Sequence, residues 1–346
     1  DFRKQCNIQE RGSPLFCNGT VPNPFKDLPA FLGTSYYTSN TISRFNLARP
    51  FPQFSGNLTQ QGRNDSFITY NSLQVNYTLR FHSGISFLGN YTLSKQIEEW
   101  GFNDPYANVY QEGLYFLDRP QVLKLTAVYE LPFGEHKHFG AGSTGLVKKL
   151  ISGWEWNTAF VDPFSGFPSD LPNAIQLKDP LTPVKDASGN FVKDASGKPI
   201  WTGVTDWKAY QVRAWNPCVL RQNDDGSVAP TPGSVALGCG AADSGNYAWF
   251  APAGFAPRYT PSRSGQIRRH HAIQMDTSLL KMTHITERLR VQFGFEAFNV
   301  LNHNYFGRDQ FDTGATSNTF GVVRPSTVST QNILPRQIAV RMKFYW

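Results

Sequence analysis

The chain has 346 residues, of which 14% are aromatic and only 17% are charged, and it contains 29 glycines and 23 prolines. This blend favours strands and turns over helices. No stretch approaches the roughly 18 to 20 consecutive apolar residues of a membrane-spanning helix. The formal net charge of +7 comes from scattered Lys and Arg residues, and the lack of a basic run argues against nucleic acid as a partner.

The four cysteines fall into two local pairs, Cys6 with Cys17 and Cys218 with Cys239, each in a stretch rich in Gly, Pro and Asn. We expect two local disulfides, although three connectivities are formally possible and reduced thiols are the alternative. Closing loops of this size contributes about 3 kcal/mol each in an oxidising compartment such as the periplasm or the cell surface. The chain begins at Asp1 without a Met or a signal-peptide pattern, which fits a processed or truncated polypeptide.

Alternation of apolar and polar residues over about ten positions is the strongest signal along the chain. In residues 72–81, SLQVNYTLRF, Leu73 and Val75 point to one face of a strand and Gln74 points to the other. A short turn at His82-Ser83-Gly84 leads into residues 85–95, and the two segments predict a hairpin. The same alternation predicts further strands at residues 121–131, 153–161, 273–279, 289–296 and 336–346. The pattern thus predicts about seven strands.

The connections between these strands differ in length. The links after Phe81 and Ile285 are short, and the link 133–152 is of middle length with a helical turn expected in GLVKKLIS. The remaining links are long and rich in turn residues, at 96–118, 165–266 and 303–332. Outer-membrane barrels have short periplasmic turns and long extracellular loops, and a tilted strand of about ten residues spans roughly 24 Å, close to the apolar band of that membrane. A soluble β-sandwich is the alternative, although its strands are usually shorter.

The C-terminal segment ends on an aromatic residue after a regular alternation. This ending resembles the signal that the barrel-assembly machinery of Gram-negative bacteria recognises. The apolar positions of this candidate barrel-assembly signal are Ile338, Val340, Met342, Phe344 and Trp346. A soluble edge strand that ends on Trp by chance is the alternative, and such a strand would be an aggregation hazard in water.

Several longer stretches resemble the C-terminal half of TonB-dependent receptors, in particular the Oar-like receptors. They include YNSLQVNYTLRFHSGISFLGNYTLSK (70–95), DRPQVLKLTAVYELPFG (118–134), GWEWNTAFVDPFSGFP (153–168), ITERLRVQFGFEAFNVLNHNYFG (285–307) and RQIAVRMKFYW (336–346). They occur in the order that the family shows and span most of residues 50–346.

The resemblance implies an all-β, antiparallel transmembrane β-barrel segment that belongs to a barrel of about 22 strands. We expect residues 1–63 to form a loop-rich extracellular segment and residues 64–346 to form the C-terminal barrel strands, with a long extracellular loop at about 165–266. The family also has a plug domain and a TonB box, neither of which is recognisable in this sequence. About seven strands do not close a barrel, and open edges are not tolerated in lipid. The remaining strands and the plug are expected from residues upstream of Asp1 or from another chain.

The resemblance implies uptake of a nutrient such as a siderophore or a carbohydrate across the outer membrane of a Gram-negative bacterium, with no enzymatic activity and no cofactor. The expected partners are outer-membrane lipid, the TonB system and the barrel-assembly machinery. A cell-surface structural or interaction subunit that transports nothing is the alternative, and a soluble carbohydrate-binding β-domain comes third. The charged residues expected to face the lumen are Lys124, Glu130, Asp276, Arg290, Glu296, Arg341 and Lys343. The loop aromatics that would capture the ligand, or pack against one another, are Trp201, Trp207, Trp215, Tyr247 and Trp249.

Other motifs carry little weight. The segment GAGSTG at 140–145 matches the dinucleotide-binding pattern but does not follow directly on a strand, so we interpret it as a coincidence. The pairs His136/His138 and His270/His271 lack further ligands at metal-binding spacing and are interpreted as surface histidines in polar turns. The tandem copies VKDASGNF (184–191) and VKDASGKP (192–199) predict an exposed hairpin or ornament.

Overall fold

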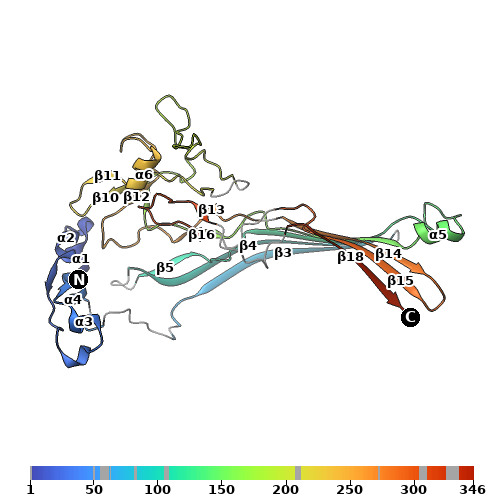
Figure 1. Cartoon of the computed structure of the whole chain (residues 1–346), viewed down its shortest axis with the longest axis horizontal. Helices are drawn as coiled ribbons and strands as arrows, with labels where there is room; N and C mark the ends of the chain where they lie inside the picture. Colours follow the sequence, from blue (N-terminus) through green and yellow to red (C-terminus); the bar gives the residue numbers. More distant parts are fainter. Residues whose placement is uncertain are drawn as a thin grey trace.

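A computed structural model of the chain describes residues 2–49, 51–54, 62, 64–81, 84–104, 109–206, 212–271, 273–303, 310–324 and 335–346. The molecule is elongated, with a long twisted sheet at one end, a folded region of short strands beside the other end of that sheet, and the N-terminal segment farther out (Figure 1). Among the described residues, no helix is both long enough and apolar enough to cross a bilayer.

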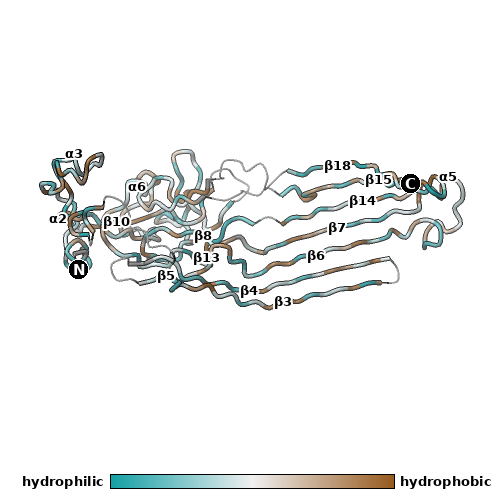
Figure 2. Tube along the Cα trace, turned by 90° about the horizontal axis from the view of Figure 1, so that it is seen from below, coloured by the Kyte–Doolittle hydropathy of each residue, from teal (hydrophilic) through white to brown (hydrophobic). Residues whose placement is uncertain are grey.

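The main sheet is antiparallel and contains all of the strands that the alternation predicts. Its order along the sheet is β18 (Gln337–Tyr345), β15 (Arg290–Phe298), β14 (Gln274–His284), β7 (Trp154–Asp162), β6 (Gln121–Glu130), β4 (Ile85–Asp104) and β3 (Ile68–Arg80). The strands lie side by side along the length of the molecule (Figure 2). The predicted hairpin is confirmed, because β3 pairs with β4 from Ile68 opposite Glu98 to Arg80 opposite Ser86.

The register places most apolar and most charged side chains of the main sheet on opposite faces. Across the strands, Gly89 pairs with Leu125, Leu125 with Phe160, and Phe160 with Met275. Opposing residues of paired strands share a face, so one mainly apolar face runs from β3 to β18. The following residues belong to this apolar face: Leu73, Val75, Phe87, Tyr91, Leu123, Leu125, Trp156, Phe160, Leu279, Phe295, Val340 and Met342.

The apolar face is not sealed into a protein interior. Leu73, Val75 and Val340 are 60%, 50% and 68% exposed. Leu125 is half-buried between its neighbours, and Val291 is the exception, since only 5% of it is exposed. Exposed apolar faces of this extent mark contact with another surface or with a membrane.

The charged residues predicted for the lumen share the opposite, polar face. Arg341 pairs with Gly294, Gly294 with Leu280, Leu280 with Glu155, and Glu155 with Glu130. An ion pair of 3.0 Å joins Arg341 Nε to Glu296 Oε1 on this face. The register places these predicted residues together on the polar face: Lys124, Glu130, Asp276, Arg290, Glu296, Arg341 and Lys343.

Short connections join strands at one end of the sheet, which we call the turn end. In the turn between β14 and β15, the Ile285 amide donates to Leu289 O at 2.9 Å, and the Leu289 amide donates to Thr286 Oγ1 at 3.0 Å. The link between β6 and β7 carries the predicted helical turn as α5 (Gly145–Ile151). This link joins two directly paired antiparallel strands, so GAGSTG lies outside any parallel βαβ unit, as expected.

The prediction of a loop at 96–118 is wrong over most of that range. Strand β4 continues to Asp104, and β5 (Val109–Leu114) pairs with this extension. The consecutive Glu98 and Glu99 break the alternation of apolar and polar residues in the sequence. The pairing of β4 with β5 is also irregular around Trp100 and Phe102. Pairing with β3 and β5 nevertheless keeps this segment extended, because hydrogen bonds across the strands do not depend on the alternation.

The predicted long loop between β7 and β14 also has a fold of its own. We call the described residues of 163–271 and 310–324 the loop domain. Its buried apolar centre includes Trp215, Trp249, Phe320, Val219 and Val323. It contains β8 (Pro168–Asp170), β9 (Ile175–Gln176), β10 (Val219–Gln222), β11 (Val228–Pro230), α6 (Pro232–Leu237), β12 (Trp249–Ala251), β13 (Arg263–Arg268), β16 (Gln310–Phe311) and β17 (Val323–Arg324). The sequence predicts a loop here because strands of two to six residues are too short to show a regular alternation of apolar and polar residues.

Each copy of the duplicated sequence makes its own small hairpin, closed by the bridges Lys185 to Phe191 and Lys193 to Pro199. The turns are mostly exposed, whereas Val184 at the start of the first copy is fully buried. The duplication therefore forms two small surface hairpins, and the buried Val184 anchors the first of them in the loop domain.

The N-terminal segment is a chain of short elements next to the loop domain. It contains α1 (Phe2–Cys6), η1 (Ile8–Glu10), α2 (Pro14–Asn18), β1 (Thr20–Pro22), η2 (Pro29–Phe31), α3 (Ser35–Thr38), β2 (Thr41–Ser43) and α4 (Arg44–Leu47). Gln9 Nε2 donates to Gln222 Oε1 at 2.8 Å, and the rings of Phe45 and Phe255 lie 4.7 Å apart. These contacts attach the segment to the loop domain rather than to the main sheet.

Candidate functional site

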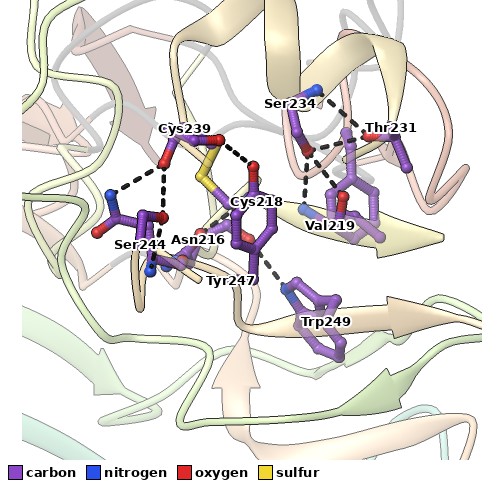
Figure 3. Close-up of a disulfide and its surroundings, with 12 residues drawn as sticks. Asn216, Cys218, Val219, Thr231, Ser234, Cys239, Ser244, Tyr247 and Trp249 are labelled. Carbon is purple, nitrogen blue, oxygen red and sulfur yellow. Dashed lines mark hydrogen bonds between the residues drawn. A yellow bond between two sulfur atoms is a disulfide. The ribbon is translucent and has the colours of Figure 1, made fainter. Parts of the chain in front are cut away.

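Both predicted cysteine pairs are disulfides. Cys6 is bonded to Cys17 in the N-terminal segment, and Cys218 is bonded to Cys239 in the loop domain. Around the second bond, Ser244 Oγ donates to Cys239 O at 3.2 Å (Figure 3). Asn246 Nδ2 donates to the same oxygen at 3.0 Å. The disulfide therefore closes a segment whose backbone is also held by side-chain hydrogen bonds.

The segment between the two cysteines folds around α6 for local reasons. Thr231 caps the helix by accepting from the Ser234 amide at 3.2 Å, Pro232 occupies the first turn, and Gly238 ends the helix in the left-handed conformation. Ser234 Oγ also accepts from the Val219 amide at 2.8 Å (Figure 3). The helix is thereby tied to β10, directly beside the disulfide.

The loop aromatics proposed for ligand capture fill the interior of the loop domain. Trp215 and Trp249 are fully buried, and Trp201 and Tyr247 are each 3% exposed. Trp249 Nε1 donates to Asn216 O at 2.9 Å (Figure 3). Tyr247 Oη donates to Gly240 O at 2.6 Å. These side chains correspond to the packing alternative, because their rings are not accessible to a ligand from solvent. Trp207 lies outside the described residues.

A first ion pair fixes the loop domain to the main sheet. Arg263 of β13 pairs with Glu98 of β4 and, at 3.1 Å, with Asp170 of β8, while the Glu98 and Arg263 side chains are only 11% and 12% exposed. The Arg263 guanidinium also lies 4.1 Å from the centre of the Trp100 ring. A guanidinium that is stacked and paired in this way is held in a single geometry.

A second ion pair has an almost fully buried carboxylate. Arg268 Nη2 lies 2.8 Å from Asp118 Oδ2, and the Asp118 side chain is 2% exposed. Arg268 also donates to Asp118 O at 3.0 Å and to Gly166 O at 3.2 Å, and Asp118 accepts from the Gln96 amide at 2.8 Å. Charges buried with all of these partners specify one arrangement of the two parts, since any other would leave a charge unpaired. We call the contacts of Arg263 and Arg268 the junction.

An open pocket of about 190 Å³ lies on the polar face beside the junction. Asp118, a junction residue, is part of its wall, and Arg119 lies beside it with its guanidinium 4.1 Å from the centre of the Phe167 ring. Lys124 is exposed, and no ion pair of Lys124 is found in the part of the chain that the structure describes. The pocket is lined by Tyr70, Thr92, Ser94, Gln96, Leu117, Asp118, Arg119, Val122 and Lys124.

The pocket combines hydroxyl groups, an amide and two cations with the apolar side chains of Leu117 and Val122, while the Asp118 carboxylate is paired with Arg268. Such a site suits a hydroxylated ligand that carries a negative charge. Sequence reasoning named Lys124 but missed Asp118, the last residue of the predicted loop 96–118, and Arg119, which directly follows that loop. Their partners Arg268 and Phe167 lie 150 and 48 positions further along the chain, so that no local pattern signals the contact.

A second pocket of about 230 Å³ lies at the turn end of the same face. Lys137 Nζ reaches Glu130 Oε2 at 2.8 Å along its wall. It is lined by Glu130, Leu131, Lys137, Gly153, Trp154, Glu155, Leu280, Met282 and Gln292. The polar face is therefore hollowed at both ends.

The first histidine pair lies in a surface turn, as expected, whereas the second pair is half-buried. His136 is 92% exposed beside Glu135 in the link after β6. His270 and His271 are half-buried with rings 6.2 Å apart, and burial together with the neighbouring His271 and His303 lowers the pKa of His270 to about 4. Burial also lowers the pKa of His271. No group of three or more metal-binding side chains is found within the described ranges.

The candidate barrel-assembly signal lies at an open edge of the main sheet. Ile338, Val340, Met342 and Phe344 share the apolar face of β18 and are 75%, 68%, 52% and 51% exposed. Trp346 follows the strand and is 94% exposed. The placement is compatible with recognition by an assembly factor, which remains a prediction.

Comparison with known proteins finds one relevant family. A family model described as an outer membrane beta barrel domain matches residues 17–339. This match covers most of the N-terminal segment, the loop domain and the main sheet except for most of β18. No curated protein and no solved structure matches the chain.

Proposed function

The chain belongs to the family of outer membrane beta barrel domains, and from this premise we propose that its sheet is part of the wall of a nutrient transporter. In such a protein the apolar face meets lipid and the polar face lines the lumen. We further propose that the loop domain and the N-terminal segment lie on the extracellular side, because long connections of outer-membrane barrels lie there.

The observation that carries the proposal is the pocket beside the junction. It opens on the polar face at the level where the loop domain is fixed to β4, so that a ligand held there would lie between the outside and the lumen. Lys124 and Arg119 supply positive charge, and Thr92, Ser94 and Gln96 supply hydrogen-bonding groups. These groups suit an anionic, hydroxylated nutrient such as a ferric siderophore or an acidic sugar.

The proposal also includes the energy source and the missing parts of the barrel. The resemblance to TonB-dependent receptors supports coupling to the TonB system. β3 and β18 are the two ends of the strand order in the main sheet, and unpaired edges are unfavourable in lipid. We therefore propose that further strands and a plug, from upstream residues or another chain, complete the barrel, and that the protein is not an enzyme.

Uptake in intact cells tests the proposal. Cells that lack the gene are compared with cells that carry the wild-type gene or Lys124→Glu, using labelled ferric siderophores and acidic and neutral oligosaccharides. We expect saturable uptake of one anionic class that disappears without the gene and on addition of a protonophore. Lys124→Glu should weaken the apparent affinity about tenfold, the equivalent of roughly 1.4 kcal/mol.

Lys343→Glu is the matched control, since Lys343 lies on the same polar face but pairs with Gln292 at the turn end. This variant should leave the apparent affinity unchanged. If the deletion strain takes up every compound at the wild-type rate, the transport proposal is wrong.

The second candidate is a structural or interaction subunit of the cell surface. The rigid attachment of the loop domain favours it, because a platform held by buried ion pairs is suited to display a fixed surface. Under this function the deletion strain would show normal uptake but would lose the surface location of a partner protein, as measured by quantitative proteomics of accessible surface proteins.

A further inference from the structure

The helix α5 is unusual among the links at the turn end. It lies beyond the ends of the main-sheet strands, at the same end of the molecule as the C-terminus (Figure 1). Leu146, Val147 and Leu150 are 78%, 58% and 69% exposed. Residues one and four positions apart lie within about 100° of one another around a helix, so these three side chains form one exposed apolar surface, which we call the α5 surface.

Trp154 connects this surface to the apolar face of the main sheet. Trp154 is paired with Lys281, two positions along the strands from the pair of Trp156 and Leu279. Residues two positions apart in a strand share a face, so the Trp154 side chain belongs to the apolar face. Its indole Nε1 donates to Leu150 O at 2.9 Å. The last turn of α5 is therefore held at the rim of the face that meets lipid.

Lys281 places a positive charge at this rim. Although the register places it on the apolar face, its ammonium group reaches the carbonyl oxygen of Ser152 and lies 5.6 Å from the centre of the Trp154 ring. Lys281 is only 7% exposed, and the Ser152 carbonyl satisfies its charge at the end of the strand. Tryptophan is typical of the boundary between acyl chains and headgroups. The boundary therefore passes close to the C-terminal end of α5.

The charges around α5 complement anionic headgroups. Lys149 is exposed, and Lys148 is paired with Glu135. An apolar surface flanked by a lysine is typical of helices that lie in the plane of the membrane interface. Adjacent exposed apolar side chains on one face of a helix suit burial in a lipid interface.

We propose that α5 is an interfacial membrane anchor whose surface of Leu146, Val147 and Leu150 is inserted into the lipid leaflet at the turn end, with Lys149 among its anionic headgroups. The occupant of the surface is lipid, because the surface continues the lipid-facing side of the sheet through Trp154. The inference rests on membership in the outer-membrane barrel family and is independent of transport. The anchor fixes the height of the turn end relative to the membrane.

Spin labelling of the whole chain, reconstituted into vesicles of phosphatidylcholine with or without phosphatidylglycerol, tests this proposal. All four native cysteines are in disulfides, so that Leu146→Cys and Leu150→Cys each provide a single labelling site. We expect both labels to collide several-fold more often with oxygen than with a water-soluble nickel chelate. Gly142→Cys, at an exposed position with open space around it, is the control and should show the opposite preference.

The charge component is tested on the label at Leu150. Adding Lys149→Glu should move this label toward water in vesicles that contain phosphatidylglycerol and should have a smaller effect in pure phosphatidylcholine. Each variant is first checked for a wild-type shift between boiled and unboiled samples on a gel, which excludes a failure to fold. Nickel-accessible labels at both leucines, or labels shielded from both reagents as at a protein interface, would overturn the proposal.

Discussion

At the residue scale, the Cys218–Cys239 disulfide closes a loop with a sequence separation of 21. Closing such a loop stabilises the folded state by about 3 kcal/mol, mainly by restricting the unfolded chain. We predict that Cys218→Ala with Cys239→Ala lowers the free energy of unfolding of the loop domain by about this amount. Urea unfolding followed through tryptophan fluorescence measures it, since Trp215 and Trp249 are fully buried beside this segment.

The matched control for this prediction is the pair Cys6→Ala with Cys17→Ala, which opens the disulfide of the N-terminal segment. It should leave the unfolding transition of the loop domain unchanged, because the contacts between the two regions are few and mostly exposed. Equal effects of the two double variants would show that the loop domain and the N-terminal segment unfold as one unit.

His270 provides a prediction about pH. Its pKa is lowered to about 4 by burial and by the neighbouring His271 and His303, whereas an unfolded histidine titrates near 6.5. The unfolded chain therefore binds more protons between these values, and the stabilising contribution is complete above about pH 6.5 and is lost as the pH falls toward 4. We predict that lowering the pH from 7 to 5 reduces the free energy of unfolding of the loop domain by on the order of 1 kcal/mol, after allowance for solvent at this half-buried site.

Urea titrations at a series of pH values measure this dependence. His270→Gln keeps a polar side chain but does not titrate, so it should reduce the slope between pH 7 and 5. The remaining slope belongs to groups such as His271, whose pKa is shifted in the same direction. An unchanged slope in His270→Gln would contradict the assignment.

At the element scale, adjacent residues of one strand face different solvents. Leu125 of β6 lies on the apolar face opposite Phe160, and Thr126 lies on the polar face opposite Ala159. A lysine on the lipid side of an outer-membrane barrel costs about 2–4 kcal/mol near the membrane centre. We predict that Leu125→Lys strongly reduces the folded fraction in lipid vesicles, whereas Thr126→Lys is tolerated.

The folded fraction of both variants is measured as the band that changes mobility on boiling. The comparison is controlled internally, because the two positions are neighbours in one strand and receive the same new side chain. A greater loss from Thr126→Lys than from Leu125→Lys would mean that the two faces are assigned the wrong way round.

The main strands were predictable from sequence because each has a face that meets one environment along its whole length. Leu123, Leu125 and Ala127 alternate with Lys124 and Thr126 for this reason. The short strands of the loop domain carry no such signal. Strand β10, for example, pairs in parallel with β12 from Val219 opposite Trp249 to Arg221 opposite Ala251, and a contact between segments this far apart follows from packing of the whole domain.

At the scale of the whole molecule, the candidate site could be predicted only in part. The alternation placed Lys124 on the polar face, which the register confirms. The pocket beside it exists because the junction brings the end of β13 onto the segment after β5, and the partners Asp118 and Arg268 are 150 positions apart. A single sequence contains charges but not their pairing, so the junction became visible only with the fold.

The junction leads to a prediction about how the loop domain is held. Replacing Asp118 with Ala leaves the Arg268 side chain, which is only 14% exposed, without its carboxylate partner, and breaking a buried pair in this way costs about 3–5 kcal/mol. It also removes the acceptor of the Gln96 amide. We therefore predict that Asp118→Ala detaches the loop domain from the outer part of β4 while the rest of the main sheet stays folded.

Hydrogen exchange in detergent or lipid measures this effect segment by segment. In Asp118→Ala, exchange should accelerate at residues 96–104 and 165–170 and remain slow in β14 and β15, which do not take part in the junction. Asp170→Ala is the control, because the Asp170 side chain is 56% exposed and exposed ion pairs contribute at most about 1 kcal/mol. If Asp170→Ala accelerates exchange as much as Asp118→Ala does, the loop domain is held by its total charge rather than by the buried pair, and the fixed geometry of the pocket beside it loses its physical basis.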